Sequence, residues 1–318
     1  MAEQKPRATR DGFGEALVEL GRRDKDVIVL SADLTASTRA DWFKSQFPDR
    51  FFAMGVAEQD MFGTAAGLAL CGKTVFACTF SVFASGRAWD QIRVSACYMN
   101  LNIKIGASHG GISVGPDGAT HQALEDLAIM LALPNMKVIV PADAIQAKKA
   151  AIEAAKADGP FYLRLGRSAV GLVSSEKDDF QIGRADVLKE GKDVAVISCG
   201  IMVFNALQAN EILAKKGLSC RVINMHTLKP IDQAAIMDCA KKTGAIVTCE
   251  EHSVVGGLGS MVSGVVAKSG PVVPIEMIGT PDVFGESGEA DELIKHFHLA
   301  PEDIAAAAEK AIKRKRKA

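Results

Sequence analysis

The sequence LNIKIGASHGGISVGPDGATHQ, residues 101–122, joins a short apolar run to a long glycine-rich segment. The apolar part is typical of a buried strand, and the pattern that follows at residues 123–131 indicates a helix. In an α/β sheet, a loop between such a strand and helix lies at the carboxyl edge, where ligands bind. This stretch therefore predicts both the fold class and the place of a site.

The same alternation of strands and helices continues on both sides of it. We predict strands at 27–31, 74–80, 101–108, 137–140, 161–165, 193–198, 220–224, 245–250 and 272–279. In the first half, helices are expected at 58–70, 84–98, 123–131 and 143–157. The pattern is that of an α/β protein with two doubly wound domains. We place a parallel-sheet domain at 1–175, a polar linker at 176–190 and a smaller mixed-sheet domain at 191–318.

Length and charge exclude several function classes. The 318 residues suffice for two domains with their own cores. The chain has 37 basic and 38 acidic residues, so its net charge is close to zero and nucleic acid is not the expected partner. We interpret the basic run 313–317 as a solvated tail. No apolar run reaches the roughly 18 residues of a membrane span. Seven scattered cysteines and an N-terminus without an apolar core favour a cytoplasmic protein.

Glu58 opens a helix of small apolar residues. Its simplest role is to complement the positive end of the helix dipole together with Asp60, and spacing alone favours this interpretation. The alternative is a carboxyl group with few charges to pair with, which acts as a hydrogen-bonded acid toward a ring nitrogen.

The glycine-rich segment carries His109, Asp117 and His121. Metal binding is conceivable, but the segment has no HxH or HxxxH pair, and glycines suit close approach to a substrate. We therefore favour substrate contacts and expect no metal ligands in this chain. The only HxH sequence, at 296–298, is expected on the surface. Three arginines stand beside predicted element ends and could bind a phosphate, although each alone is an ordinary surface residue: Arg10, Arg164 and Arg167.

These signals occur together and in a recognisable order. The following stretches resemble the pyrimidine-binding domain of transketolase: RATRDGFGEALVEL, SADLTAST, FFAMGVAEQDMFGTAAGLALCG, TFSVF, SHGGISVGPDGATHQALEDLA, LPNMKVIVPAD and GPFYLRLGRS. Further along, EEHSVVGGLGS resembles the C-terminal domain of the same family. The resemblance extends from about residue 7 to the end, and the AEQ sequence combined with GxDGxTHQ is specific.

A transketolase also needs a domain that grips the diphosphate of thiamine diphosphate through Mg²⁺, with a GDG motif that this chain lacks. The resemblance therefore implies the C-terminal subunit of a split transketolase. Its partner would be an N-terminal subunit that carries the diphosphate and the magnesium, in a two-plus-two assembly. The pair would transfer a two-carbon ketol unit from a ketose phosphate to an aldose phosphate.

The resemblance also assigns residues. Glu58 matches the acid that hydrogen-bonds the aminopyrimidine ring of the coenzyme, and Asp33 matches an acid near the coenzyme and the subunit contact. Two aromatic residues, Phe80 and Phe83, match those that pack the ring. The sugar phosphate positions are Arg10, Ser37, His109 and Arg167. Asp117 and His121 match positions near the sugar hydroxyls, and His109, His121 and Glu58 are the expected catalytic groups.

The sequence also departs from the family pattern. Gly86 stands where a third ring-packing aromatic is common, and the sequence RAWDQ at 87–91 resembles deoxyxylulose-phosphate synthases. Arg164 matches the phosphate position less well than Arg167. A decarboxylating half-enzyme of that kind, a 2-oxoacid dehydrogenase β subunit, and a non-catalytic module that binds a partner stay open as alternatives.

Overall fold

The apolar run of the quoted stretch forms the central strand of a seven-stranded sheet in the computed structural model, which describes residues 5–315. The strand order is β12-β6-β7-β5-β4-β2-β3, and only β12 runs antiparallel to its neighbour. The strands are β2 (Val27–Ser31), β3 (Phe51–Ala53), β4 (Thr74–Phe80), β5 (Ile103–Ser108), β6 (Lys137–Ile139), β7 (Phe161–Arg164) and β12 (Thr227–Lys229). The predicted parallel sheet is confirmed.

Helices cover both faces of this sheet, which is why its strands are apolar on both sides. One face packs against α1 (Thr9–Arg23), α2 (Ala40–Gln46) and α7 (Ala144–Lys156). The other packs against α3 (Glu58–Leu70), α4 (Ser81–Arg87), η2 (Ile92–Tyr98) and α6 (Asp126–Leu131). Short elements complete the domain: η1 (Pro48–Arg50), α5 (Trp89–Gln91), η3 (Ile112–Asp117) and a ribbon of β1 (Arg7–Ala8) and β8 (Ala169–Val170).

The predicted helix 84–98 is wrong in its bounds and continuity. It starts at Ser81, is interrupted at Ala88, and ends in the π-helical turns of η2. Its apolar period continues through the interruption, so the pattern alone indicated one helix.

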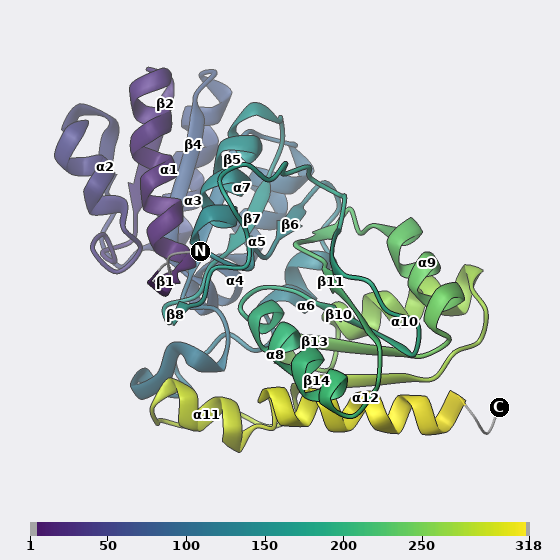
Figure 1. Ribbon diagram of the computed structural model, residues 1–318. Helices are drawn as coiled ribbons and strands as arrows, with labels where there is room; N and C mark the ends of the chain where they lie inside the picture. The colour runs from purple at the N-terminus through teal and green to yellow at the C-terminus, as the bar shows by residue number, and fades with distance from the viewer. Residues whose placement is uncertain (1–4, 316–318) are drawn as a thin grey trace.

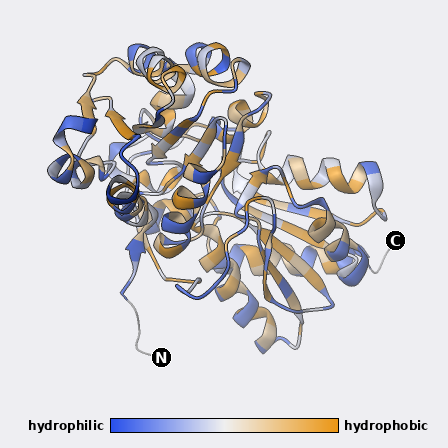
Figure 2. Cartoon of the chain, turned by 90° about the horizontal axis from the view of Figure 1, so that it is seen from above, coloured by the Kyte–Doolittle hydropathy of each residue, from blue (hydrophilic) through white to orange (hydrophobic). Residues whose placement is uncertain are grey.

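The second sheet is mixed and has five strands in the order β14-β13-β10-β11-β9, with β9 antiparallel. Its strands are β9 (Asp186–Lys189), β10 (Val194–Ser198), β11 (Cys220–Asn224), β13 (Ile246–Ser253) and β14 (Ile275–Thr280). Its helices are α8 (Met202–Lys215), α9 (Gln233–Thr243), α10 (Leu258–Ser269), α11 (Ala290–His296) and α12 (Pro301–Lys315). Figure 1 shows this domain in green and yellow beside the first, and Figure 2 shows largely hydrophobic strands inside both. Two doubly wound domains are confirmed.

Two segments cross the predicted domain boundaries. Residues 186–189, predicted within the linker, form the edge strand β9. The strand β12 comes after β11 in the chain but pairs with β6 of the first sheet. A polar edge strand alternates between half-buried and exposed residues, so it looks like a linker in the sequence. The boundaries at 175 and 191 themselves stay a prediction.

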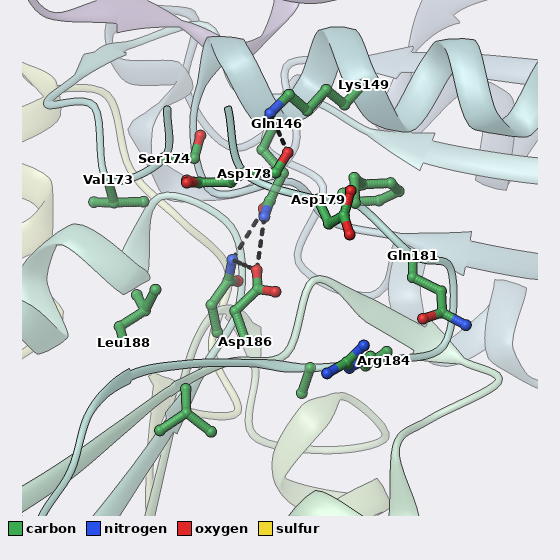
Figure 3. Close-up of a pocket in the computed structure, with 14 residues that line it drawn as sticks. Gln146, Lys149, Val173, Ser174, Asp178, Asp179, Gln181, Arg184, Asp186 and Leu188 are labelled. Carbon is green, nitrogen blue, oxygen red and sulfur yellow. Dashed lines mark hydrogen bonds between the residues drawn. The ribbon is translucent and has the colours of Figure 1, made fainter. Parts of the chain in front are cut away.

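A polar junction lies just before the predicted linker. Asp143 caps α7 through the N–H of Gln146 at 2.8 Å and also accepts from the N–H groups of Val173 and Ser174, both at 2.7 Å. Gln146, Val173 and Ser174 also line a cavity of about 580 Å³. Figure 3 shows Gln146 directed toward Asp186, to which its Nε2 donates at 3.2 Å. Because these groups bond to one another, we assign the cavity a structural role.

Smaller expectations have mixed outcomes. His296 and His298 are exposed, while Phe297 between them is buried. The basic run 313–317 is a helix end rather than a tail as far as it is described: residues 313–315 belong to α12, and Arg314 pairs with Glu276. Residues 316 and 317 lie outside the described range. No helix within residues 5–315 has the length and apolar character needed to cross a membrane.

We expect Asp143→Ala to lower the free energy of unfolding by about 3 kcal/mol, because it removes a helix cap and leaves the N–H groups of Val173 and Ser174 without their acceptor. Urea unfolding at fixed protein concentration measures this. Asp49→Ala, at an exposed carboxylate, is the control and should change stability by less than about 0.5 kcal/mol. Equal effects of the two variants would contradict the role of the junction.

Candidate functional site

A pocket lies at the carboxyl edge of the first sheet. Ser37 follows β2, Phe80 ends β4, His109 follows β5 and Arg167 follows β7. Because these strands are parallel, their ends meet at one edge, and Arg10 joins them from the first turn of α1. The pocket has a volume of about 450 Å³ and is lined by Arg10, Ala36, Ser37, Arg39, Phe80, His109, Asp117 and Arg167. The structure thus brings together six of the predicted site residues.

Arginines give this pocket its charge. A terminal nitrogen of Arg10 donates to the carbonyl of Ser37 at 2.9 Å and lies 3.4 Å from Nε2 of His109. Burial lowers the pKa of Arg10, and the neighbouring Arg39 lowers it further. Arg167 donates to the carbonyl of Val114 at 2.7 Å and to Asp117 at 3.1 Å. Such converging guanidinium groups suit a phosphate or another anion.

His109 is almost fully buried, with 2% of its surface exposed. Its Nδ1 lies 2.8 Å from the hydroxyl of Ser108, and its ring stacks on Phe80 at a centroid distance of 3.7 Å. Burial, followed by the charges of Arg10 and Arg167, lowers the pKa of His109 to about 3. The imidazole is therefore neutral at physiological pH, and one of its nitrogens can accept a hydrogen bond.

A row of rings leads away from His109. Phe80 stacks on Phe83 at 5.8 Å, and His121 meets both edge-on at 6.1 and 5.3 Å. The hydroxyl of Thr120 lies 2.9 Å from Nδ1 of His121. His121 therefore belongs to the same cluster, although it does not line the cationic pocket.

Glu58 stands at the other end of this row. It begins α3, is 3% exposed, and pairs with Arg87 at 3.0 Å. The guanidinium of Arg87 also lies over the ring of Phe83, 3.9 Å from its centroid. The alternative interpretation of Glu58 assumed few charges to pair with, but α4 supplies one, because it brings Arg87 one turn after Phe83. The same arginine links the acid to the aromatic row.

Two predicted features lie at the margin. Asp33 is exposed in the loop after β2, has a φ of 58°, and is not among the residues that line the pocket. Gly86 is exposed, and a Cβ added there would meet no heavy atom within 4 Å. The position of the missing aromatic is therefore open in this chain.

Arg164 has a structural role. It is buried and donates to both oxygens of Asp126, at 2.8 and 3.1 Å, and to the carbonyls of Ala123 and Glu251, both at 2.9 Å. Its Nε and Nη2 are bound to protein groups, and it does not line the cationic pocket. Among residues 5–315, no group of three or more His, Cys, Asp or Glu side chains is placed to hold a metal ion.

Sequence reasoning missed two arginines of the site. Arg39 lines the pocket and pairs with Asp11 at 2.7 Å. It stands two residues after Ser37, and that proximity was the available signal. Arg87 begins the RAWDQ sequence, but that motif does not indicate that it pairs with Glu58, which lies 29 residues away in the chain.

Comparisons with known proteins agree with this architecture. Residues 5–172 match the family model "Transketolase, pyrimidine binding domain", and residues 183–304 match "Transketolase, C-terminal domain". A putative transketolase C-terminal section from Methanocaldococcus jannaschii is 47% identical, over 93% of both chains. A 6-deoxy-6-sulfo-D-fructose transketolase subunit from Clostridium sp. is 42% identical, over 96% of this chain and 95% of the relative.

A solved structure is also similar. It is a split gene transketolase, described as an inactive beta4 tetramer, with a TM-score of 0.89 and 48% identity, over 97% of this chain and 99% of the other. Both family models, the two near full-length relatives and this structure lead to one conclusion: the chain belongs to the transketolase family, as the subunit of a split transketolase that contains the pyrimidine-binding and C-terminal domains.

Proposed function

We propose that this chain supplies half of the active site of a thiamine-diphosphate-dependent transketolase and, with an N-terminal partner subunit, moves a two-carbon ketol unit from a ketose phosphate to an aldose phosphate. The supporting observation is the continuous row from Glu58 through Phe83, Phe80 and His109 to the arginine pocket. One end of the row offers a buried acid and flat rings, and the other offers cations.

The acid and aromatic end fits an aminopyrimidine ring. The carboxylate of Glu58 is buried, Arg87 links it to the half-buried ring of Phe83, and a Cβ added at nearby Gly86 would meet no heavy atom within 4 Å. Glu58 would bond the ring nitrogen, while Phe80 and Phe83 would pack the ring and exclude water. Arg87 now contacts Glu58 and Phe83, and its half-exposed side chain can move aside. When bound, the coenzyme supplies the nucleophilic carbon that cleaves the ketose bond between C2 and C3.

The cationic end fits the sugar phosphate. Arg10 and Arg167 would hold the phosphate oxygens, with Ser37 beside them. Neutral His109, fixed by Ser108 and Phe80, would bond the sugar close to the phosphate without adding another charge. Asp117 and His121 would orient the hydroxyls, and we assign proton transfer there to His121, while His109 contributes a hydrogen bond.

An exposed apolar face beside Glu58 is where we place the partner subunit. Val56, Leu70 and Tyr98 are 70%, 62% and 85% exposed, and Cβ atoms at Gly63 and Gly67 of α3 would meet no heavy atom within 4 Å. A subunit seated here would cover the end of the site where Glu58 lies. We assign to it the diphosphate and the Mg²⁺, in a cytoplasmic two-plus-two assembly.

One observation favours a second candidate. The contact of Arg87 with Glu58 involves the RAWDQ sequence, which resembles deoxyxylulose-phosphate synthases. A panel of pentulose phosphates, a sulfosugar ketose and pyruvate, tested with the reconstituted pair, separates the candidates. Ketol transfer supports the transketolase proposal, and carbon dioxide release from pyruvate supports the alternative. If the pair catalyses neither reaction, a non-catalytic role follows.

In the pair reconstituted with thiamine diphosphate and Mg²⁺, we expect Glu58→Gln to lower kcat by about 100-fold or more, because the amide cannot exchange a proton with the ring. Steady-state ketol transfer measures this. Asp60→Asn, an exposed acid in the same helical turn, is the matched control and should retain activity. Wild-type rates in Glu58→Gln would contradict the assignment.

Arg167→Gln is expected to raise KM for a phosphorylated ketose about tenfold or more, because a charge-assisted contact to the phosphate is lost. A ketose without phosphate should show a nearly unchanged KM. Arg22→Gln changes an exposed arginine of α1 that bonds Gln46, and it serves as control. An equal rise of KM for both ketoses in Arg167→Gln would refute a phosphate contact.

His109 should make the stability of the chain depend on pH. Its folded pKa of about 3 lies below the ordinary value of 6.5, so the unfolded chain binds the extra proton first as pH falls. Stability from this group is complete above pH 6.5 and is lost toward pH 3. We expect wild type to lose on the order of 1–2 kcal/mol more than His109→Gln between pH 7.5 and pH 5. The urea unfolding midpoints of both proteins, measured between pH 7.5 and pH 5, test this. If the two midpoints fall in parallel as the pH is lowered, the prediction is contradicted.

A further inference from the structure

The glycine-rich segment of the site rests on the C-terminal domain. Glu251 lies on β13 of the second sheet, and its Oε1 accepts the backbone N–H of Ser113. The side chain passes directly beneath Gly111, where an added Cβ would come within 2.3 Å of the Glu251 carboxyl carbon. Gly111 also has a φ of 90°, so both the backbone conformation and the close approach require glycine.

The segment bound by Glu251 also contains the groups that accept hydrogen bonds from Arg167, the arginine proposed to bind the phosphate. Ser113 is followed by Val114, whose carbonyl accepts from Arg167, and by Asp117, which pairs with Arg167. The carbonyl of Ser113 accepts from the hydroxyl of Ser168 at 2.8 Å. Ser113 is therefore bound on one side to Glu251 and on the other to the residue next to Arg167.

The contact is built into the core. Glu251 is 5% exposed, and its own carbonyl accepts from Arg164 at 2.9 Å. Arg164 in turn holds Asp126 and the carbonyl of Ala123, which also accepts the N–H of Gly111. The carboxylate of Glu251 thus has a fixed place beneath the segment, and a shift of it would be transmitted to the turn around Ser113.

We propose that Glu251 is a positioning residue of the site: through the N–H of Ser113, the C-terminal domain sets the geometry of the segment that holds Arg167. The proposal rests on the proposed function in one respect, that Arg167 binds the phosphate of the sugar. It gives the C-terminal domain a part in substrate binding, although none of its residues up to 315 lines the cationic pocket.

The neighbouring residue supplies a matched control. Glu250 is also buried on β13, but successive strand residues face opposite ways, and its carboxylate accepts from the N–H groups of Leu258 and Gly259 at 2.7 and 2.8 Å. It caps α10, and neither of these hydrogen bonds reaches the glycine-rich segment. Loss of either carboxylate removes a buried acceptor, so both changes should lower stability.

The test compares Glu251→Ala, Glu251→Asp, Glu251→Gln and Glu250→Ala in the full chain with its partner subunit. The alanine variant lacks the acceptor for the N–H of Ser113, and the aspartate side chain is one methylene group too short to reach it. Both variants should therefore raise KM for the ketose phosphate about fivefold or more. Glutamine keeps Oε1 and should stay within about twofold of wild type. KM for a ketose without phosphate and half-saturation by coenzyme should stay near wild type in all four variants.

A second measurement needs no activity. Hydrogen exchange of the amides at 111–117 should be faster in Glu251→Ala and Glu251→Asp, but unchanged in Glu250→Ala despite its lower melting temperature. Unchanged KM and exchange in the alanine and aspartate variants, or the same changes in Glu250→Ala, would overturn the proposal. If wild type itself transfers no ketol unit, the proposed function fails, and the exchange data alone then decide whether Glu251 holds the segment.

Discussion

The buried ion pair between Arg164 and Asp126 is the contact on which the rest of the structure depends. Arg164 ends β7 and Asp126 begins α6. The Nη2 of Arg164, which donates to Asp126, also donates to the carbonyls of Ala123 and Glu251. One side chain therefore fixes the first sheet, the end of the glycine-rich segment and the second domain at once. A charge in this place must keep all its partners, because an unpaired buried ion costs about 3–5 kcal/mol.

Much of the fold could be predicted from the sequence because its signals are local. The runs at 27–31, 74–80 and 220–224 are apolar over the length of one strand, and each forms a strand with those bounds. The sequence could not indicate that β12 joins the first sheet. That pairing brings together residues about 90 positions apart. A strand of three residues is too short for its sequence pattern to indicate which strand it pairs with.

The candidate site divides in the same way. Ser37, His109 and Arg167 follow predicted strands, whose parallel pairing brings them to one edge, and Arg10 lies in a stretch that resembles the family, so motif and topology sufficed. Arg87 and Glu251 act through contacts between segments that neither spacing nor composition relates. EEHSVVGG was visible as a family motif, but which of its two glutamates faces the first domain depends on the register of β13.

The strand that crosses between the domains also bears on how the chain can be divided. The β6 edge of the first sheet is covered only by β12, which comes from the second half of the chain. A fragment ending at residue 190 would have unpaired N–H and C=O groups along β6, and a bare edge of this kind recruits strands from other molecules. We therefore expect an isolated pyrimidine-binding half to be prone to aggregation, because it would lack residues 227–229, which pair with this edge.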